Sequence, residues 1–250
     1  MKIIKYKKAK NGKYSVFLDD GREFLFYEEV ILKYDLLLKK EILDKDLNDI
    51  NQSNLEYDVY YVALNNIRNR YRSTFELIEL LKKKEYPIEM IDMAIDKLTK
   101  QGYLNDHNYA KSYINTQIIT TNHGPNRIKG DLEKKRISSD IINEEIDAFT
   151  EEEQREKIKK IIEYRIKINR TRGGVVLQKK IYNDCLLLGY DSTIINSVMN
   201  NYTFTNYTDL AKKEYDKLYK KLSSKYSGYE LEKRIKEKMY MKGLSYEEEL

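Results

Sequence analysis

Two different periods of apolar residues divide the chain. In residues 1–27, β-branched and aromatic residues fall in three short runs, separated by the turn dipeptides Asn11-Gly12 and Asp20-Gly21. A dipeptide of this kind between two apolar runs is typical of a β-hairpin. The pattern therefore predicts three short antiparallel strands at the start of the chain.

A short amphipathic segment follows the predicted strands. Its apolar residues have helical spacing and predict one short helix with an inner face of Val30, Ile31, Tyr34 and Leu37. The polar stretch at residues 49–54 then predicts the end of an N-terminal domain over residues 1–55.

From Tyr57 onward the apolar residues follow the helical period. The first helical face is formed by Tyr60, Ala63, Leu64, Ile67 and Tyr71. Ser73 followed by Glu76 is a capping box and predicts the start of a second helix. Pro87 has no N–H to donate, so it predicts a break before a third helix, which ends at Gly102. The apolar face of that third helix comprises Ile88, Ile91, Ile95 and Leu98.

The three-helix pattern recurs along the rest of the chain. It predicts four repeats, over residues 57–104, 105–149, 150–202 and 203–250. Turns between second and third helices are expected at Tyr86, Ile137, Tyr190 and Leu244, which lie 51, 53 and 54 residues apart. Further helix starts are expected at Gly124-Pro125, at Thr150 with Glu153, at Ser227 with Glu230, and at Ser245.

Repeats of this size bury little surface alone, so stacked neighbours must complete each core. The sequence therefore predicts an all-α fold of tandem three-helix repeats in an elongated curved solenoid, with a small β-rich N-terminal extension. The alternative is a non-repetitive helical bundle whose helices coincide in phase.

Composition narrows the function classes. The net charge of +5 permits an anionic partner without requiring one, because a lysine-rich surface is also well solvated. The sequence has no run of 18 apolar residues and no signal-peptide pattern, which predicts a soluble cytoplasmic protein. The single cysteine, Cys185, lies in an apolar stretch and is expected to be a buried free thiol.

Catalytic motifs are absent from the sequence. It contains neither a P-loop nor a dinucleotide-binding glycine motif. His107 and His123 lack metal-ligand spacing to each other or to Cys185. The carboxylates that follow Thr150 lie in the first turn of a predicted helix, where they suit the helix dipole. We therefore expect a protein without enzyme activity, metal or cofactor.

Two arginine clusters remain as candidates for binding a partner. They surround the sequences "NRYRS" at residues 69–73 and "NRTRG" at residues 169–173, each at a junction between first and second helices. The planar guanidinium suits phosphate or carboxylate recognition, although a cation at a helix C-terminus also stabilises the dipole by about 0.3–1 kcal/mol. The second and fourth repeats carry the less basic sequences "TNHG" and "KYSG" there. The candidate binding residues are Arg68, Arg70, Arg72, Arg165, Arg170 and Arg172.

Three segments in order resemble the core motifs of the RecX family, which regulates the RecA recombinase. They are "YRSTFELIELLKKKEY" (residues 71–86), "GYLNDHNYAKSYI" (residues 102–114) and "GPNRIKGDLEKKRI" (residues 124–137). The resemblance is clear over residues 58–149 and looser over residues 150–250. Two positions depart from the family pattern: Glu85 stands where the family usually has glycine, and residues 183–185 replace a usually basic segment.

The resemblance implies tandem three-helix repeats and a monomeric, non-enzymatic regulator in the cytoplasm. Its partner would be the RecA filament on single-stranded DNA, and whether DNA is contacted directly stays open. Bound protein would inhibit filament growth, ATP hydrolysis and strand exchange during recombination, DNA repair and the SOS response. Two alternatives remain: a helix-turn-helix transcription regulator, and a general helical-repeat scaffold for protein interactions.

Overall fold

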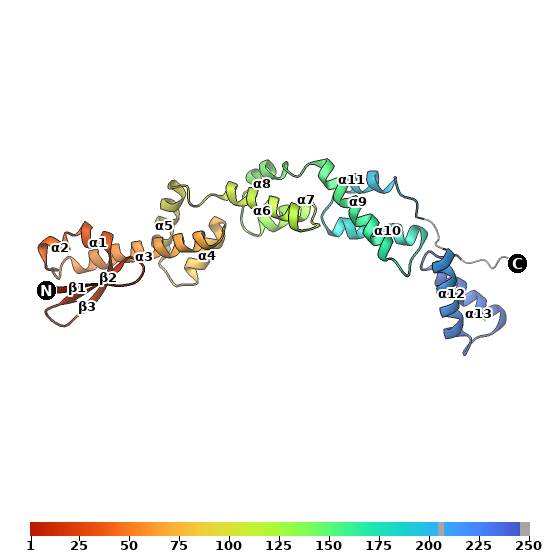
Figure 1. Cartoon of the computed structure of the whole chain (residues 1–250), viewed down its shortest axis with the longest axis horizontal. Coiled ribbons are helices and arrows are strands. Elements are labelled where there is room, and N and C mark those ends of the chain that lie inside the picture. The colour runs from red at the N-terminus through yellow and green to blue at the C-terminus, as the bar shows by residue number, and fades with distance from the viewer. Residues whose placement is uncertain (205–207, 246–250) are drawn as a thin grey trace. The chain divides into compact units, whose positions relative to one another are not determined.

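The computed structural model describes residues 1–204 and 208–245 and confirms a helical chain with an N-terminal three-stranded sheet (Figure 1). The chain divides into two compact units. Unit 1 comprises Met1–Tyr109 with Lys135–Ile137, and unit 2 comprises Ala110–Lys134 with Ser138–Leu250. Each unit is described by itself.

The sheet of unit 1 has the predicted three strands. They are β1 (Ile3–Lys8), β2 (Lys13–Leu18) and β3 (Glu23–Tyr27), antiparallel and in sequence order. The glycines of both predicted turns have positive φ, 73° at Gly12 and 87° at Gly21. This backbone conformation is unfavourable for other residues, which explains the glycines.

Two short helices follow the sheet, where the sequence predicts one. They are α1 (Glu28–Lys33) and α2 (Leu36–Lys39), separated by Asp35 in the left-handed conformation with φ 54°. This break shifts the helical phase. As a result Leu36 is buried at 2% exposure, while Leu37, which was predicted to face the core, is 50% exposed.

The next helix runs through the position at which the sequence places the end of the N-terminal domain. Helix α3 (Leu47–Asn69) runs without interruption through the polar stretch at residues 49–54 and through the predicted boundary at residues 55–57. The polar side chains there contact the sheet. Asn54 Oδ1 accepts the Tyr27 N–H at 2.9 Å, and Asn54 Nδ2 donates to the Leu25 carbonyl at 3.1 Å.

A second polar contact joins the sheet to the helices of unit 1. Asp58 on α3 accepts hydrogen bonds from Lys13 Nζ at 2.6 Å, Tyr27 OH at 2.9 Å and Tyr86 OH at 2.6 Å. Burial would raise the pKa of Asp58, but these donors outweigh burial and lower it. Burial and the Asp58 carboxylate together raise the pKa of Tyr86 to about 12. One carboxylate therefore connects the sheet, α3 and the turn at Tyr86.

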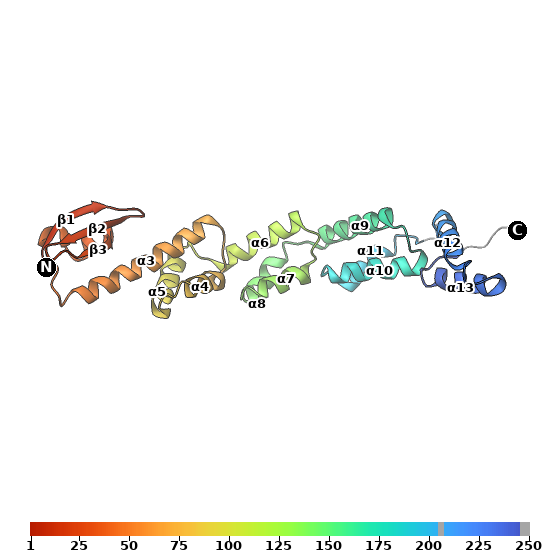
Figure 2. The ribbon, with the colours of Figure 1, turned by 90° about the horizontal axis from the view of Figure 1, so that it is seen from below.

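Helix α3 packs against α4 (Thr74–Lys82) and α5 (Ile88–Lys100), as Figure 2 shows. The predicted capping box of Ser73 and Glu76 is present at the start of α4. Two predicted core residues are wrong, since Tyr71 is 68% exposed and Ile88 is 53% exposed. Residues buried in this three-helix core include Val59, Ala63, Leu77, Leu81, Met90, Ile91, Ala94 and Leu98.

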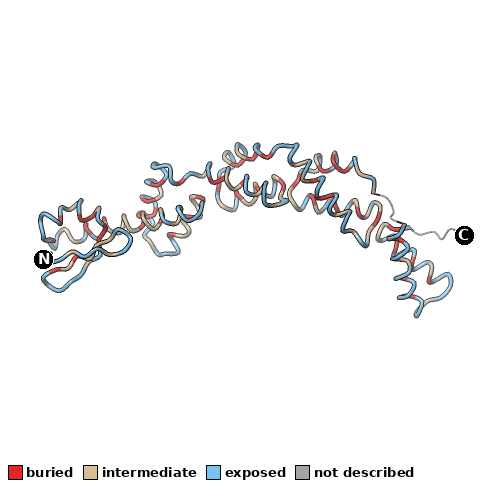
Figure 3. Tube along the Cα trace, in the orientation of Figure 1, coloured by how far each residue is buried: buried red, intermediate tan, exposed pale blue. Residues whose placement is uncertain are grey.

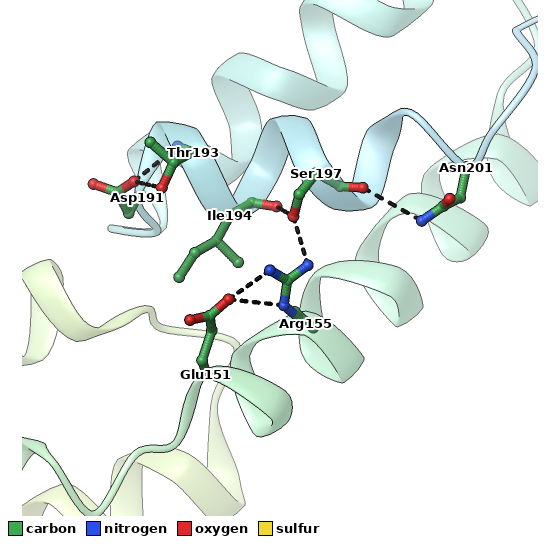
Figure 4. A network of polar contacts seen from close by, with 7 residues as sticks. All are labelled: Glu151, Arg155, Asp191, Thr193, Ile194, Ser197 and Asn201. Carbon is green, nitrogen blue, oxygen red and sulfur yellow. Dashed lines mark hydrogen bonds and ion pairs between the residues drawn. The ribbon is translucent and has the colours of Figure 1, made fainter.

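The remaining helices have 8 to 18 residues and buried inner faces (Figure 3). They are α6 (Asp106–Thr120), α7 (Pro125–Glu133), α8 (Ser139–Ile146), α9 (Glu151–Ile168), α10 (Gly174–Leu187), α11 (Ser192–Met199), α12 (Thr208–Leu222) and α13 (Gly228–Tyr240). Polar contacts add to this packing. Arg155 on α9 donates to Ser197 Oγ on α11 at 2.6 Å while it is also bound to Glu151 (Figure 4).

The predicted helix starts are confirmed in part. Pro125 begins α7 after Gly124, and Thr150 forms a capping box with Glu153. The box predicted at Ser227 is wrong, because the Ser227 side chain makes no capping hydrogen bond to α13. The helix predicted to begin at Ser245 lies outside the described residues.

The turn between second and third helices has one recurring conformation. The residue before each predicted turn position has a positive φ: 63° at Glu85, 58° at Arg136, 93° at Gly189 and 70° at Gly243. Glycine adopts this conformation readily, whereas another residue costs roughly 1–2 kcal/mol. The departure noted at Glu85 is therefore a strained backbone position in which glycine would fit better.

The starts of three second helices, α4, α7 and α10, contact the turn of the following three-helix group. In unit 1, Ser73 Oγ donates to the Lys135 carbonyl at 3.2 Å. In unit 2, the Gly124 N–H donates to Leu188 at 2.7 Å, and the Gly173 N–H donates to Lys242 at 2.9 Å. We call these three contacts the junctions. They require a small residue at the helix start, because a Cβ on Gly124 would lie 2.6 Å from backbone atoms of Gly189.

Candidate anion-binding site

The loop at residues 169–173 follows the end of α9 and leads into the junction at Gly173. Asn169 fixes its shape: the side-chain oxygen accepts the Arg172 N–H at 3.1 Å, and the side-chain nitrogen donates to the Arg172 carbonyl at 2.5 Å. Asparagine is favoured at such turns because its short amide can bond to the backbone two or three residues on. The conformation of this loop sets the positions of Arg170 and Arg172 within it.

Arg170 is exposed, and its guanidinium is bound at the end of its own helix. Arg170 Nη1 donates to the carbonyls of Lys167 and Asn169, both at 2.9 Å. These are among the carbonyls that a helix end leaves without a partner, so the helix-end role considered for the arginines is present here. The same contacts hold the guanidinium in place before any ligand arrives.

Arg165 lies one turn before the end of α9 and faces α10. Its Nε is 3.2 Å from Asp184 Oδ2, and the Asp184 side chain is only 22% exposed. The acidic residue at this family departure is therefore the ionic partner of a predicted binding arginine. Charge on Arg165 is partly balanced by Asp184.

The three arginines of this corner lie around one cavity. Arg165, Arg170 and Arg172 line a cavity of about 300 Å³, together with Lys180 on α10. The apolar part of the wall is contributed by Ile168, Leu177 and Ile181. A phosphate or carboxylate fits this combination, since several cations meet beside a surface that excludes water from one side. We call it the arginine cavity.

A larger cavity lies on the other side of the same loop. It has a volume of about 950 Å³ and shares Asn169, Arg170 and Thr171 with the arginine cavity. Its far wall is α12, which contributes Lys213 and Lys217 as well as Asp209, Leu210 and Glu214. Glu214 is paired with Lys242 at 2.6 Å. Arg170 therefore lies between two cavities that both carry excess positive charge.

Sequence reasoning missed the lysines of this site. Lys180, Lys213 and Lys217 lie on three different turns of α10 and α12, among many other exposed lysines. The spacing of Lys213 and Lys217 places them on one helix face, but no local signal shows which loop that face meets. The packing of α12 beside residues 169–171 identifies Lys213 and Lys217, and the packing of α10 against α9 identifies Lys180.

The second predicted cluster lies in unit 1. Arg68 is in the last turn of α3 and Arg70 is the residue that ends it, and both are exposed. Arg72 folds back, with its Nε 3.4 Å from the Asn66 carbonyl. The neighbouring carboxylate, Glu76, is bound by Lys135 Nζ at 2.7 Å. Burial would raise the pKa of Glu76, but Lys135 and the Ser73 N–H outweigh burial and lower it.

Cys185 and His123, two side chains that could carry nucleophilic or metal chemistry, are held by the fold. Cys185 is fully buried, and burial raises the pKa of its thiol to about 11. A thiol of this kind carries little thiolate at neutral pH and is a poor nucleophile. His123 Nδ1 lies 3.1 Å from Gln117 Oε1. In residues 1–204 and 208–245, no helix has the length and apolar character needed to cross a membrane.

The chain is similar in sequence to proteins named RecX. The family model "RecX, second three-helix domain" matches residues 105–145. The regulatory protein RecX of Listeria monocytogenes serotype 4a is 28% identical over 99% of this chain and 94% of its own length. That of Streptococcus gordonii is 30% identical over 98% of this chain and 96% of its own length.

Solved structures show the same similarity. A crystal structure of regulatory protein RecX matches with a TM-score of 0.70 and 26% identity, covering 80% of this chain and 98% of that one. A crystal structure of RecX from Lactobacillus salivarius matches with a TM-score of 0.55 and 28% identity, covering 60% of this chain and 97% of that one. Sequence and structure therefore agree, and the chain belongs to the RecX family of regulatory proteins.

Proposed function

We propose that this protein is a non-enzymatic, monomeric regulator that binds RecA and its single-stranded DNA filament in the cytoplasm. It inhibits filament growth, ATP hydrolysis and strand exchange, and so limits recombination, DNA repair and the SOS response. Family membership supports a regulatory role. The arginine cavity is the observation that carries the proposal, because it offers a binding surface for an acidic group of a partner.

The mechanism is binding and involves no bond making. Arg165, Arg170 and Arg172 contact carboxylates on the RecA surface, and the phosphates of the bound DNA strand are the alternative anions. Arg170 is already held by two carbonyls of its own helix end, so little side-chain entropy is lost when a partner binds. Bound protein then favours a RecA state that neither grows nor turns over.

The arginines of unit 1 form a second proposed contact. Arg68 and Arg70 are exposed, and Arg72 lies beside them at the start of the junction. Their proposed role is to bind a second acidic group of the same filament. A contact made at two separated sites gains affinity through effective concentration, so each site alone need bind only weakly.

The test is ATP hydrolysis by RecA on single-stranded DNA during titration with this protein. The wild-type chain should inhibit at sub-equimolar ratios. Arg170→Ala with Arg172→Ala should raise the concentration for half inhibition at least tenfold, and adding Arg70→Ala should raise it further. Arg22→Ala is the matched control, because Arg22 is a similarly exposed arginine on a β-turn, paired with Asp20. It should change inhibition less than twofold.

Two results would contradict the proposal in different ways. If the wild-type chain does not inhibit RecA up to an equimolar ratio, the assignment of the partner is wrong. Inhibition by the arginine variants equal to that of the wild type, with unchanged helical circular dichroism, would show that these residues are only helix-end charges. Sequence-specific footprints on duplex DNA would instead favour the transcription regulator.

A further inference from the structure

Helix α13 carries two tyrosines and two lysines along one exposed face, with the lysines between the tyrosines. Tyr229, Lys233, Lys236 and Tyr240 are spaced by four, three and four residues, which places all four on one face of a helix. The four residues are exposed, and the buried residues of α13 lie on another face. We call this set the α13 stripe.

The two tyrosines at the ends of the stripe are almost fully exposed. Tyr229 is 85% exposed and Tyr240 is 82% exposed. Single exposed apolar side chains are common on protein surfaces, but two such rings on one helix face, with two cations between them, form a patterned surface. Eleven residues of helix separate the rings by about 16 Å.

A groove lies beside one end of the stripe. It has a volume of about 400 Å³ and is lined by Tyr215, Lys236, Glu237, Met239, Tyr240, Leu244 and Ser245. Tyr215 is held in place by its hydroxyl, which donates to Glu232 at 2.7 Å. The groove therefore combines aromatic and aliphatic walls with one lysine and one glutamate.

The charge around the stripe favours an anionic partner. Residues 208–245 contain ten lysines and one arginine against six acidic residues. Glu230 is paired with Arg234 at 3.1 Å. Glu237 lines the groove beside Lys236, so the charges of the groove itself cancel, and the excess positive charge that favours an anionic chain comes from Lys233 on the stripe and from the other lysines of residues 208–245.

We propose that the α13 stripe binds single-stranded nucleic acid. Bases stack on the rings of Tyr229 and Tyr240, and Lys233 and Lys236 neutralise the phosphates between them. Unpaired bases present their faces to such rings, whereas a duplex keeps its bases stacked on one another. An acidic peptide would use the lysines but would gain little from two exposed rings. The inference does not depend on the contact proposed between the arginine cavity and RecA.

The experiment measures binding of the full chain to a fluorescein-labelled 12-nucleotide oligo(dT) by fluorescence anisotropy, without RecA. Tyr229→Ala with Tyr240→Ala should weaken binding at least tenfold, because one stacked base contributes about a factor of ten or more. Tyr229→Phe with Tyr240→Phe should retain binding within about threefold, since the ring face is preserved. The control Tyr103→Ala removes another exposed tyrosine and should have less than a twofold effect.

The lysines have a separate readout in the dependence on salt. Removing Lys233 and Lys236 should reduce the slope of log affinity against log salt by about 1.4, from roughly 0.7 for each phosphate contact on a single strand. Lys83→Ala with Lys84→Ala removes the same charge from the exposed end of α4 and should change the slope by less than the roughly 0.7 of one phosphate contact.

Three outcomes would overturn the inference. Equal affinity of the wild type and the double alanine variant would exclude the stripe as the contact. A loss that phenylalanine does not restore would exclude stacking. Displacement of the oligonucleotide by an equal concentration of oligoglutamate would assign the stripe to acidic protein. Because RecA is not present, none of these results bears on the proposed inhibition of ATP hydrolysis.

Discussion

The corners at residues 69–73 and 169–173 begin with the same asparagine and the same pair of alternating arginines, yet they use different chemistry at the junction. In unit 1 the Ser73 side chain caps α4 and also bonds to Lys135. In unit 2 the Gly173 backbone N–H bonds to Lys242, and α10 has no side-chain cap. Serine and glycine meet the same requirement, a small residue at a helix start that touches the next turn.

The arginines of the two corners also differ in their surroundings. Arg72 folds back onto Asn66, whereas Arg165, Arg170 and Arg172 line one cavity with Lys180. The similarity in sequence therefore has two causes. The small residue follows from the junction, which recurs. The arginines of unit 2 line a cavity, which distinguishes that corner from the corner in unit 1. The following experiments separate the two causes.

The largest expected effect is at the unit 2 junction. A Cβ on Gly243 would lie 2.2 Å from the Gly173 carbonyl and 2.9 Å from Val176, at a φ of 70°. Gly243→Ala should reduce the free energy of unfolding by about 2–5 kcal/mol, from backbone strain and overpacking together. Thermal unfolding and hydrogen exchange at the Gly173 amide would measure it.

The matched control for that change is Gly102→Ala. Gly102 has a similar φ of 76°, but a Cβ there meets nothing within 4 Å among the described residues. It should cost only the strain, about 1–2 kcal/mol. Equal losses in the two variants would show that contact with Gly173 contributes nothing to stability.

The unit 1 junction should respond less. Ser73→Ala removes the helix cap and the hydrogen bond to Lys135 and should cost about 1–2 kcal/mol in chemical denaturation. Ser138→Ala removes a cap that bonds only to Ile141 in its own helix, and we expect a smaller loss of about 0.5–1 kcal/mol. A loss at Ser73 no larger than at Ser138 would mean that the bond to Lys135 is energetically neutral.

Acid should weaken the unit 1 junction through Glu76. Its pKa is below the ordinary value of 4.5 in the folded protein, so its contribution to stability is present above about pH 4.5 and is lost as pH falls through the folded pKa. Glu76→Gln should remove this pH dependence and cost about 1 kcal/mol at pH 7. Denaturation at pH 7 and pH 3 would test both statements. An unchanged pH dependence in the variant would assign it to other carboxylates.

The smallest expected effect concerns Arg72. Its contacts with Asn66 are long, at 3.4 and 3.5 Å, so Arg72→Ala should change the free energy of unfolding by less than about 0.5 kcal/mol. Arg165→Ala should cost more, about 1–2 kcal/mol, because it leaves the largely buried Asp184 without its ionic partner. Equal values from chemical denaturation would contradict the difference between the two corners.

Much of the fold could be predicted from the sequence because turns and helix starts depend on residues close together in the chain. Turn dipeptides specified the hairpins, and the spacing of the four turns revealed the repeats. The two differences between prediction and structure have different causes. The polar stretch at residues 49–54 is part of α3, and its Asn54 bonds to Tyr27 of the sheet, a contact between distant residues that local periodicity does not contain. The split at Asp35 is local, because Asp35 itself adopts the left-handed conformation, which aspartate tolerates better than most residues.

The site was less accessible to sequence reasoning. The two corners could be named from the sequence, because each has two arginines separated by one residue next to a predicted helix end. The cavity beside Arg165, Arg170 and Arg172 depends on how α9 and α10 pack, and the second cavity depends on where α12 lies. Lys180, Lys213 and Lys217 could therefore be named only once those helices were in place.

The junctions have a consequence for how such a chain changes length. Ser227 and Gly228 begin α13 with φ and ψ of −140° and 161° and then a φ of 54°, close to the −135°, 174° and 47° of Gly173 and Gly174. The last described second helix thus starts with the backbone form of the Gly173 junction, in which the N–H donates to the Lys242 carbonyl. A further segment of about fifty residues, the spacing of the turns, could add its turn at the start of α13 without a change in any residue before it. Duplication of a gene segment could therefore lengthen such a chain and leave the contacts of the preceding helices intact.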